Sequence, residues 1–179
     1  MLVATERSPE AADTALVRAA ALGDRAAFGV LYEQYRRMVH GILLSYVAFG
    51  DAEDLMQDVF VAAMQRLSTL RDAPAFGGWL ASIARHTAVD HVRRRMRIVE
   101  ANERNCGAQP PERIGDEAER VFRGIQALPE AYRETMMLRL VEGMNGPEIA
   151  ARTGLKPDSV RVNLCRGLKL LRESLGRNV

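Results

Sequence analysis

The stretch from Asn145 to Arg166 constrains the fold most, because its turn residues fix the ends of two short helices. Asn145 is a good N-cap, and Glu148 three residues later completes a capping box that satisfies free amides at a helix start. Gly154 suits the left-handed position that ends a helix, and Pro157 opens a second helix. The pattern predicts a helix-turn-helix unit, although a plain antiparallel helix pair has similar signals.

The predicted second helix has one apolar side and one polar side. Its apolar positions recur at helical spacing and are Val160, Leu164, Leu168 and Leu171. Its polar side carries Ser159, Arg161, Asn163, Arg166 and Lys169. A helix with a basic, hydrogen-bonding front can lie in the major groove of DNA, so this helix is interpreted as a DNA-reading element.

Charge is unevenly distributed along the chain, although the formal net charge is only +2. Residues 85–97 contain five Arg and one Asp, and residues 149–179 contain seven Lys or Arg and two acids. Residues 51–58 contain four acids and no base. The basic segments indicate a polyanionic partner and the acidic segment a basic protein surface, unless each is simply a solvated face.

Several classes of protein are excluded by composition. Cys106 and Cys165 lie far apart without ligand spacing, and His86 and His91, five residues apart, are poor metal candidates. The N-terminus lacks an apolar signal core, and no stretch approaches the roughly 18 apolar residues of a membrane span. We therefore expect a cytoplasmic protein with no metal, no cofactor and no membrane insertion.

Helical periodicity runs through the chain, and no segment alternates like a strand, so the fold is expected to be all-α. We divide the sequence into a flexible leader (1–12), a helical domain (13–97), a flexible linker (98–116) and a second helical domain (117–179). The linker contains Pro110 and Pro111. Its residues could span up to roughly 65 Å when extended, so the two domains need not touch.

Two segments of the first domain have a distinctive chemistry. Asp51 is expected to cap a helix that presents an acidic outer face, including Asp54, Gln57 and Asp58. Residues 71–78 are predicted to form a loop because of their Pro and Gly content. The helix that begins at Trp79 ends in a cluster of Arg residues that exceeds what the helix dipole requires, which indicates contact with phosphate.

These features, in this order, resemble the extracytoplasmic-function (ECF) group of sigma-70 RNA polymerase sigma factors. The motifs are residues 51–60 (DAEDLMQDVF), residues 79–85 (WLASIAR) with the Arg cluster, and residues 128–133 (LPEAYR) leading to the helix-turn-helix. The resemblance covers residues 13–97 as sigma region 2 and residues 117–176 as sigma region 4.

The resemblance implies site residues for three contacts. The surface for the clamp helices of the polymerase β′ subunit would consist of Asp54, Leu55, Gln57, Asp58, Val59 and Phe60. The surface for the melted −10 element and nearby DNA would consist of Phe76, Trp79, Arg85, His86, Arg93, Arg94 and Arg95. The surface for the −35 element would consist of Lys156, Ser159, Arg161, Val162, Asn163, Arg166 and Lys169.

The expected partners are therefore core RNA polymerase (β′ clamp helices and β flap), promoter DNA and an anti-sigma factor inserted between the domains. No catalytic residue is expected, because transcription chemistry belongs to the polymerase. His86 stands where many members have Asn, which affects how the −10 element would be read. Val162 with Asn163 replaces a usual Ser-Arg pair, which predicts an unusual −35 preference. A dimeric helix-turn-helix regulator without polymerase docking is the main alternative, and a recombinase is a weaker one.

Overall fold

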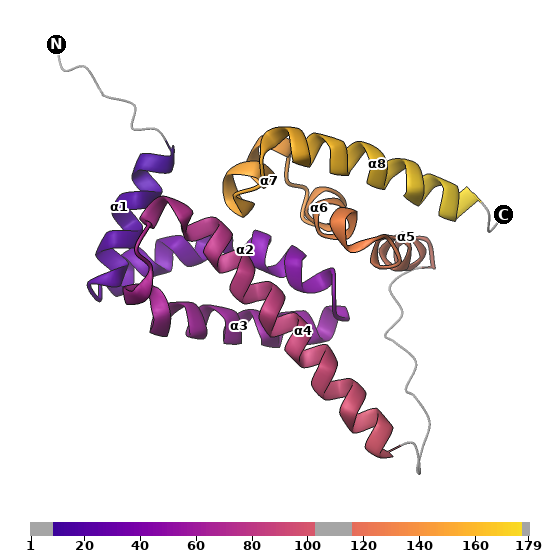
Figure 1. Ribbon diagram of the computed structural model, residues 1–179, viewed down its shortest axis with the longest axis horizontal. Coiled ribbons are helices and arrows are strands. Elements are labelled where there is room, and N and C mark those ends of the chain that lie inside the picture. Colours follow the sequence, from indigo (N-terminus) through magenta and orange to yellow (C-terminus); the bar gives the residue numbers. More distant parts are fainter. Residues whose placement is uncertain (1–8, 103–115, 177–179) are drawn as a thin grey trace.

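The computed structural model describes residues 9–102 and 116–176, and all regular structure in these ranges is helical (Figure 1). The N-terminal helices are α1 (Pro9–Ala21), α2 (Arg25–Leu44), α3 (Phe49–Arg66) and α4 (Phe76–Asn102). Two short 3-10 turns, η1 (Leu67–Thr69) and η2 (Ala73–Ala75), connect α3 to α4. The C-terminal helices are α5 (Asp116–Gln126), α6 (Glu130–Leu140), α7 (Gly146–Thr153) and α8 (Pro157–Gly176). The predicted all-α fold with two helical domains is confirmed.

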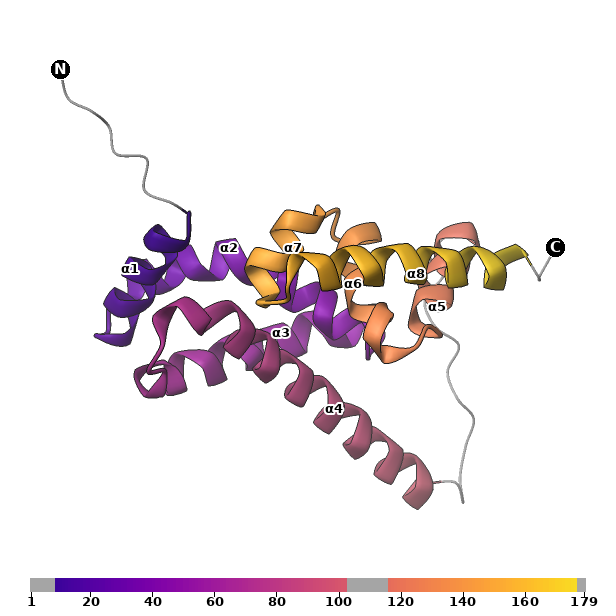
Figure 2. The ribbon, with the colours of Figure 1, turned by 45° about the horizontal axis from the view of Figure 1, so that its top comes forward.

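Two predicted boundaries differ from the observed ones. Helix α1 already begins at Pro9, and α4 continues to Asn102, which is beyond the expected start of the linker. The C-terminal part of α4 projects away from the other helices in both views (Figures 1 and 2). The rest of the predicted linker, residues 103–115, lies outside the described residues.

The N-terminal domain is built on α2, which buries one face along its length. Asp24 caps this helix, and its carboxylate accepts hydrogen bonds from the amides of Ala26 and Ala27 at 2.9 and 3.1 Å. Its inward residues recur at helical spacing and include Leu31, Met38 and Ile42, all fully buried. Helices α1, α3 and α4 pack around α2.

Two local predictions in this domain are wrong. Asp51 is not an N-cap, because α3 already begins at Phe49 with Ala48 in the cap position and no side-chain cap. Phe76 and the two glycines after it do not belong to a loop, because they form the first turn of α4. The 3-10 turn η2 takes the place of the expected loop.

The C-terminal domain follows the sequence prediction closely. Asn145 and Glu148 form both hydrogen bonds of a capping box, at 2.9 and 2.7 Å. Gly154 ends α7 in the left-handed conformation with φ +73°. Helix α8 packs closely on α6 at Gly167, where a Cβ would lie 2.6 Å from Cγ of Met136. The helix-turn-helix prediction is therefore confirmed.

The two domains pack against each other, although the sequence allowed them to be separate. Helix α6 contacts α2, and α7 contacts both α2 and α4. Gly41 of α2 permits this approach, since a Cβ there would lie 2.7 Å from Cδ2 of Leu138 on α6. Buried apolar residues of both domains form one continuous cluster. None of the described helices combines the length and apolar character needed to cross a lipid bilayer.

Candidate protein-binding and nucleic-acid interfaces

A stripe of exposed side chains runs along the outer face of α3. Asp54, Gln57 and Asp58 form its acidic end, with Asp54 one turn before the other two, and all three are exposed to solvent. Val61 and Met64 continue the same face and are 50% and 53% exposed. We call these five residues the α3 stripe. Since it combines carboxylates with apolar groups that nothing in the described chain covers, it suits a partner with basic and apolar side chains.

The other three residues predicted for this contact are not on the surface. Leu55, Val59 and Phe60 are buried in the core, with Val59 fully buried. Phe60 packs against the ring of Tyr32, with the ring centroids 4.6 Å apart. These three residues recur at the spacing of an inward-facing side of a helix. They hold α3 in position, and their side chains are not available for direct contact with a partner.

The front of α8 carries most of the residues predicted to read DNA. Six of the seven are exposed to solvent, and they are Lys156, Ser159, Arg161, Val162, Arg166 and Lys169. The guanidinium of Arg161 lies 3.4 Å from the carboxylate of Asp158, and both side chains are highly exposed. Such an exposed pair contributes little to stability, so Arg161 can exchange this partner for a phosphate.

Asn163 does not belong to this exposed front. Its side-chain amide donates a hydrogen bond to Oγ1 of Thr135 at 3.3 Å, and Thr135 is buried on α6. The predicted contact of Asn163 with the −35 element therefore lacks support, since the side-chain amide faces the supporting helix α6. The side chain instead fixes how α8 lies on α6, together with the close contact at Gly167.

The first turn of α4 buries one of its two aromatic residues and leaves the other partly exposed. Phe76 is 1% exposed and packs edge-to-face on Tyr35, with the ring centroids 5.0 Å apart. Trp79 is only half-buried and lies 5.8 Å from Phe76, centroid to centroid. Phe76 cannot meet a DNA base in this arrangement. Trp79 retains an accessible edge, and His86 further along the helix is exposed.

Arg85 is engaged with the other domain. Its Nε and Nη2 atoms donate hydrogen bonds to the two carboxylate oxygens of Glu134 on α6, at 2.7 and 2.8 Å. This paired geometry raises the pKa of Arg85, chiefly through the hydrogen bonds to Glu134, against a smaller opposing effect of burial. Arg85 is thus a half-buried interdomain residue, and the predicted DNA contact requires it to leave Glu134.

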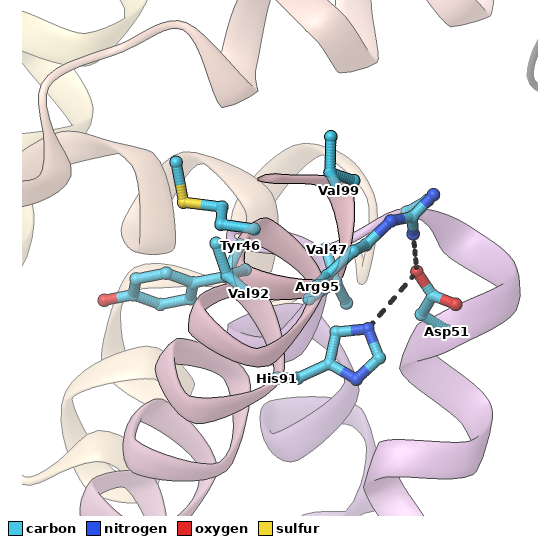
Figure 3. Close-up of a pocket in the computed structure, with 9 residues that line it drawn as sticks. Tyr46, Val47, Asp51, His91, Val92, Arg95 and Val99 are labelled. Carbon is cyan, nitrogen blue, oxygen red and sulfur yellow. Dashed lines mark hydrogen bonds and ion pairs between the residues drawn. The ribbon is translucent and has the colours of Figure 1, made fainter. Parts of the chain in front are cut away.

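The Arg cluster at the end of α4 lies beside a surface cavity of about 430 Å³. Arg93 and Arg94 are exposed, but Arg95 forms an ion pair with Asp51 at 2.8 Å. Figure 3 shows Arg95 and His91 both facing the carboxylate of Asp51 from α4. The Asp51 carboxylate is therefore engaged by α4 and does not cap α3. Among the described residues, no ion pair is seen for the exposed Arg93 and Arg94, which can serve as cations of the predicted DNA contact.

Several residues with specific interactions gave no signal in the sequence. Glu134 pairs with Arg85, and Asp13 accepts hydrogen bonds from both Tyr35 and Arg152. These partners are 22 to 139 residues apart, so no local pattern marks them. Met64 could have been found, because it continues the helical spacing of the acidic residues of α3.

Comparison with known proteins adds independent evidence. The family model for Sigma-70 region 2 matches residues 31–98, and the model for Sigma-70 region 4 matches residues 118–171. The ECF RNA polymerase sigma-E factor of Escherichia coli (strain K12) is 31% identical, and the match covers 89% of this chain and 92% of the relative.

Two solved structures are similar to this one. The structure of CnrH, in complex with the cytosolic domain of CnrY, is 27% identical with a TM-score of 0.63, covering 94% of this chain and 99% of CnrH. The sigma factor RpoE of Bartonella quintana, in complex with the anti-sigma factor NepR, has a TM-score of 0.54. At 21% identity, over 83% of this chain and 94% of that one, RpoE supports the fold alone.

The arrangement of a helix with an exposed acidic face, an Arg-rich helix and a terminal helix-turn-helix agrees with both family models. These matches do not favour the alternative of a dimeric regulator that acts without polymerase. Sigma factors are non-enzymatic initiation factors, which direct core polymerase to promoters. The chain belongs to the sigma-70 family of RNA polymerase sigma factors, and it is a transcription initiation factor of the ECF group.

Proposed function

We propose that this sigma factor binds core polymerase through the α3 stripe and binds promoter DNA through α4 and α8. One observation carries the proposal: an exposed acidic and apolar stripe lies on one domain, and an exposed basic helix front lies on the other. The two surfaces have opposite charge and therefore suit different partners, a basic protein and a polyanion.

The α3 stripe is assigned to the clamp helices of the β′ subunit. Asp54 and Asp58 would attract basic side chains, while Val61 and Met64 would supply apolar area at the centre of the contact. Leu55, Val59 and Phe60 contribute from inside the domain by holding α3 in place. The β flap remains the expected partner of region 4.

Helix α8 is assigned to the −35 element. Arg166 and Lys169 lie along its exposed front, where a guanidinium can contact guanine or phosphate in the major groove. Val162, which is 39% exposed, can contact a thymine methyl group. Asn163 has a positioning role through Thr135, so it contributes to the orientation of α8 and not to base reading.

Helix α4 is assigned to the −10 element. Trp79 offers a half-buried aromatic surface next to the first turn, and His86 lies exposed two turns further along. Single-stranded DNA is bound by stacking on such rings together with cations that follow the backbone. Arg93 and Arg94 would supply those cations. Arg85 and Arg95 would join them after release from Glu134 and Asp51.

The wider cellular role follows from these assignments. We place the protein in the cytoplasm with its polymerase and assign no covalent step to it. CnrH is held by the cytosolic domain of CnrY, and we propose that a comparable anti-sigma protein controls this factor. Such a protein would bind both domains and compete with polymerase.

Binding assays with purified core polymerase test the proposal. The factor is expected to co-elute with core polymerase and to bind promoter DNA tightly only in that complex. Binding of the isolated protein to a palindromic duplex as a dimer, without co-elution with polymerase, would contradict the proposal and support a polymerase-independent regulator.

A further inference from the structure

A side-chain hydrogen bond within α4 fixes the imidazole of His86. Its Nδ1 atom lies 2.7 Å from the carbonyl oxygen of Ser82, one turn earlier in the helix, and 3.4 Å from the Ser82 hydroxyl oxygen. A carbonyl oxygen carries no proton and can only accept, so Nδ1 is the donor of this bond. In a neutral imidazole one nitrogen donates and the other accepts. Nε2 is therefore the acceptor of His86.

The acceptor nitrogen is free to meet a partner. His86 is exposed, and within residues 9–102 and 116–176 no hydrogen bond or ion pair involves its Nε2 atom. The bond at Nδ1 also orients the ring, so that Nε2 has a defined direction from the helix. An Asn side chain, which many members of the family have at this position, offers both a donor and an acceptor. His86 offers one acceptor only, and this narrows the set of atoms that it can bind.

His86 lies on the face of α4 that is assigned to the −10 element. Trp79, His86 and Arg93 follow one another at intervals of seven residues, so they share one side of the helix. Seven residues rise about 10 Å, which matches about three base pairs of DNA. Trp79 is half-buried and Arg93 is exposed. His86 thus stands between an aromatic ring and a cation, where its side chain can reach the edge of a base.

The major groove offers few partners to an acceptor such as Nε2. The only hydrogen-bond donors there are the amino groups N6 of adenine and N4 of cytosine, whereas guanine and thymine present acceptors. Each base pair contains one of these amino-bearing bases, so a side chain that only accepts selects the strand on which that base lies. With guanine or thymine in its place, two acceptors face each other and the hydrogen bond is lost.

We propose that His86 is a specificity-determining residue of the −10 contact, with Nε2 accepting a hydrogen bond from the amino group of an adenine or cytosine in the major groove. The main-chain carbonyl of Ser82 has a positioning role, because it decides which ring nitrogen faces the DNA. This inference rests on the proposed function, since α4 must lie on the −10 element for His86 to reach a base.

Nitrogen NMR of the isotopically labelled imidazole rings tests the tautomer in the free full-length protein, without polymerase or DNA. Spectra are recorded at about pH 8, above the usual titration range of histidine. The signals that disappear in His86→Ala are those of His86. Nε2 is expected to show the chemical shift of a nitrogen without a proton, and Nδ1 that of a protonated nitrogen. The reverse assignment, or an even mixture of both tautomers, would overturn the inference.

The Ser82→Ala variant separates the two oxygens that lie near Nδ1. It removes the hydroxyl and keeps the main-chain carbonyl, so the tautomer of His86 is expected to persist. A change of tautomer in Ser82→Ala would refute the positioning role of the carbonyl.

Base preference is measured by run-off transcription with the reconstituted holoenzyme, on promoters whose −10 element is randomised. At one base pair, adenine or cytosine on one strand is expected to be favoured over guanine or thymine by at least about fivefold, as for one hydrogen bond. His86→Ala should lose this preference. His91→Ala is the matched control, because His91 lies on the same helix but faces Asp51 of α3, and it should keep the preference. Retention of the preference in His86→Ala would overturn the inference.

Removal of the amino group tests the contact atom itself. At the preferred position, adenine is replaced by purine, or cytosine by pyrimidin-2-one, so that only the amino group is missing. The unmodified holoenzyme is expected to lose at least about fivefold in transcription, beyond any loss that His86→Ala shows with the same templates. Equal losses in the two proteins would refute the bond to Nε2, because an effect on base pairing alone is the same for both.

The outcomes separate this inference from the proposed function. Promoter-specific transcription with a base preference that does not depend on His86 refutes the role of His86 alone. Absence of promoter-specific transcription with the unmodified protein refutes the proposed function, whereas the NMR result on the tautomer stands independently of it.

Discussion

The guanidinium of Arg85 and the carboxylate of Glu134 form a paired hydrogen-bond contact across the boundary between region 2 and region 4, with N–O distances of 2.7 and 2.8 Å. Arg85 belongs to a basic segment that predicts DNA binding, yet two of its N–H donors are occupied by the Glu134 carboxylate. Its availability to DNA is therefore coupled to the position of region 4.

Removal of Glu134 should release Arg85 to DNA. In Glu134→Ala, binding of the free protein to single-stranded −10 DNA is expected to gain about one phosphate contact, which steepens the salt dependence by about 0.7 in log–log slope. Fluorescence anisotropy over a salt series measures this slope. The double variant Arg85→Ala/Glu134→Ala should lose the gain, and an unchanged slope in Glu134→Ala would contradict the coupling.

Asp58→Arg should weaken the complex with core polymerase at least about tenfold, because it places a cation where a basic partner is expected to dock. The side chain is exposed, so the fold should be preserved, which circular dichroism checks. Glu117→Arg, at an exposed position on α5, serves as the matched control. Equal affinity of both variants in a titration with labelled polymerase would refute the assignment of the α3 stripe.

Arg166 and Asn163 should behave differently despite lying on the same helix. Arg166→Ala is expected to cost about 1–3 kcal/mol in −35-dependent binding of the holoenzyme, with relaxed preference at one base pair if the guanidinium reads a base. Asn163→Ala should instead lower the free energy of unfolding by about 0.5–1.5 kcal/mol, through loss of its bond to Thr135. A change of base preference in Asn163→Ala would show that its side chain reads DNA.

Alkaline pH should weaken the fold through Tyr35. Burial, and then the nearby Asp13 carboxylate, raises the pKa of Tyr35 from 10.0 to about 12. Because the folded pKa exceeds the unfolded one, the neutral phenol contributes stability that is complete below pH 10.0 and is lost as the pH rises to about 12. Urea unfolding of Tyr35→Phe should show a smaller decline over this range than the unmodified protein.

A second tyrosine, Tyr46, should contribute to the same loss of stability at alkaline pH. Burial, followed by its hydrogen bond to Glu130, raises the pKa of Tyr46 to about 12 as well. Tyr46→Phe should therefore remove a second part of the decline, and the double variant should show the smallest one. Equal slopes for all four proteins would refute both assignments.

Local sequence signals predicted the C-terminal domain well. The capping box at Asn145 and the left-handed Gly154 depend on residues within a few positions of each other, and both were correct. Asp51 was misassigned as a cap, because its carboxylate is engaged by Arg95 from a distant helix and α3 begins earlier. Interactions between residues that are close in the sequence can be predicted from it, whereas a contact such as Asp51 with Arg95, between distant residues, cannot.

The candidate sites were predictable to a different extent for each partner. The acidic residues of α3 and the basic residues of α8 were identified correctly as exposed surfaces. The burial of Phe76 and the pairing of Arg85 depend on how the two domains meet, which no periodicity encodes. The sequence allowed separate domains, and their close packing emerged only from the structure.

Run-off transcription with purified core polymerase on a genomic promoter library tests the central claim most directly. Core polymerase supplemented with this protein is expected to start transcripts at a distinct set of promoters that share −35 and −10 elements, and core polymerase alone should not. Absence of any promoter-specific transcript, with folded protein and active core polymerase in the assay, would contradict the account.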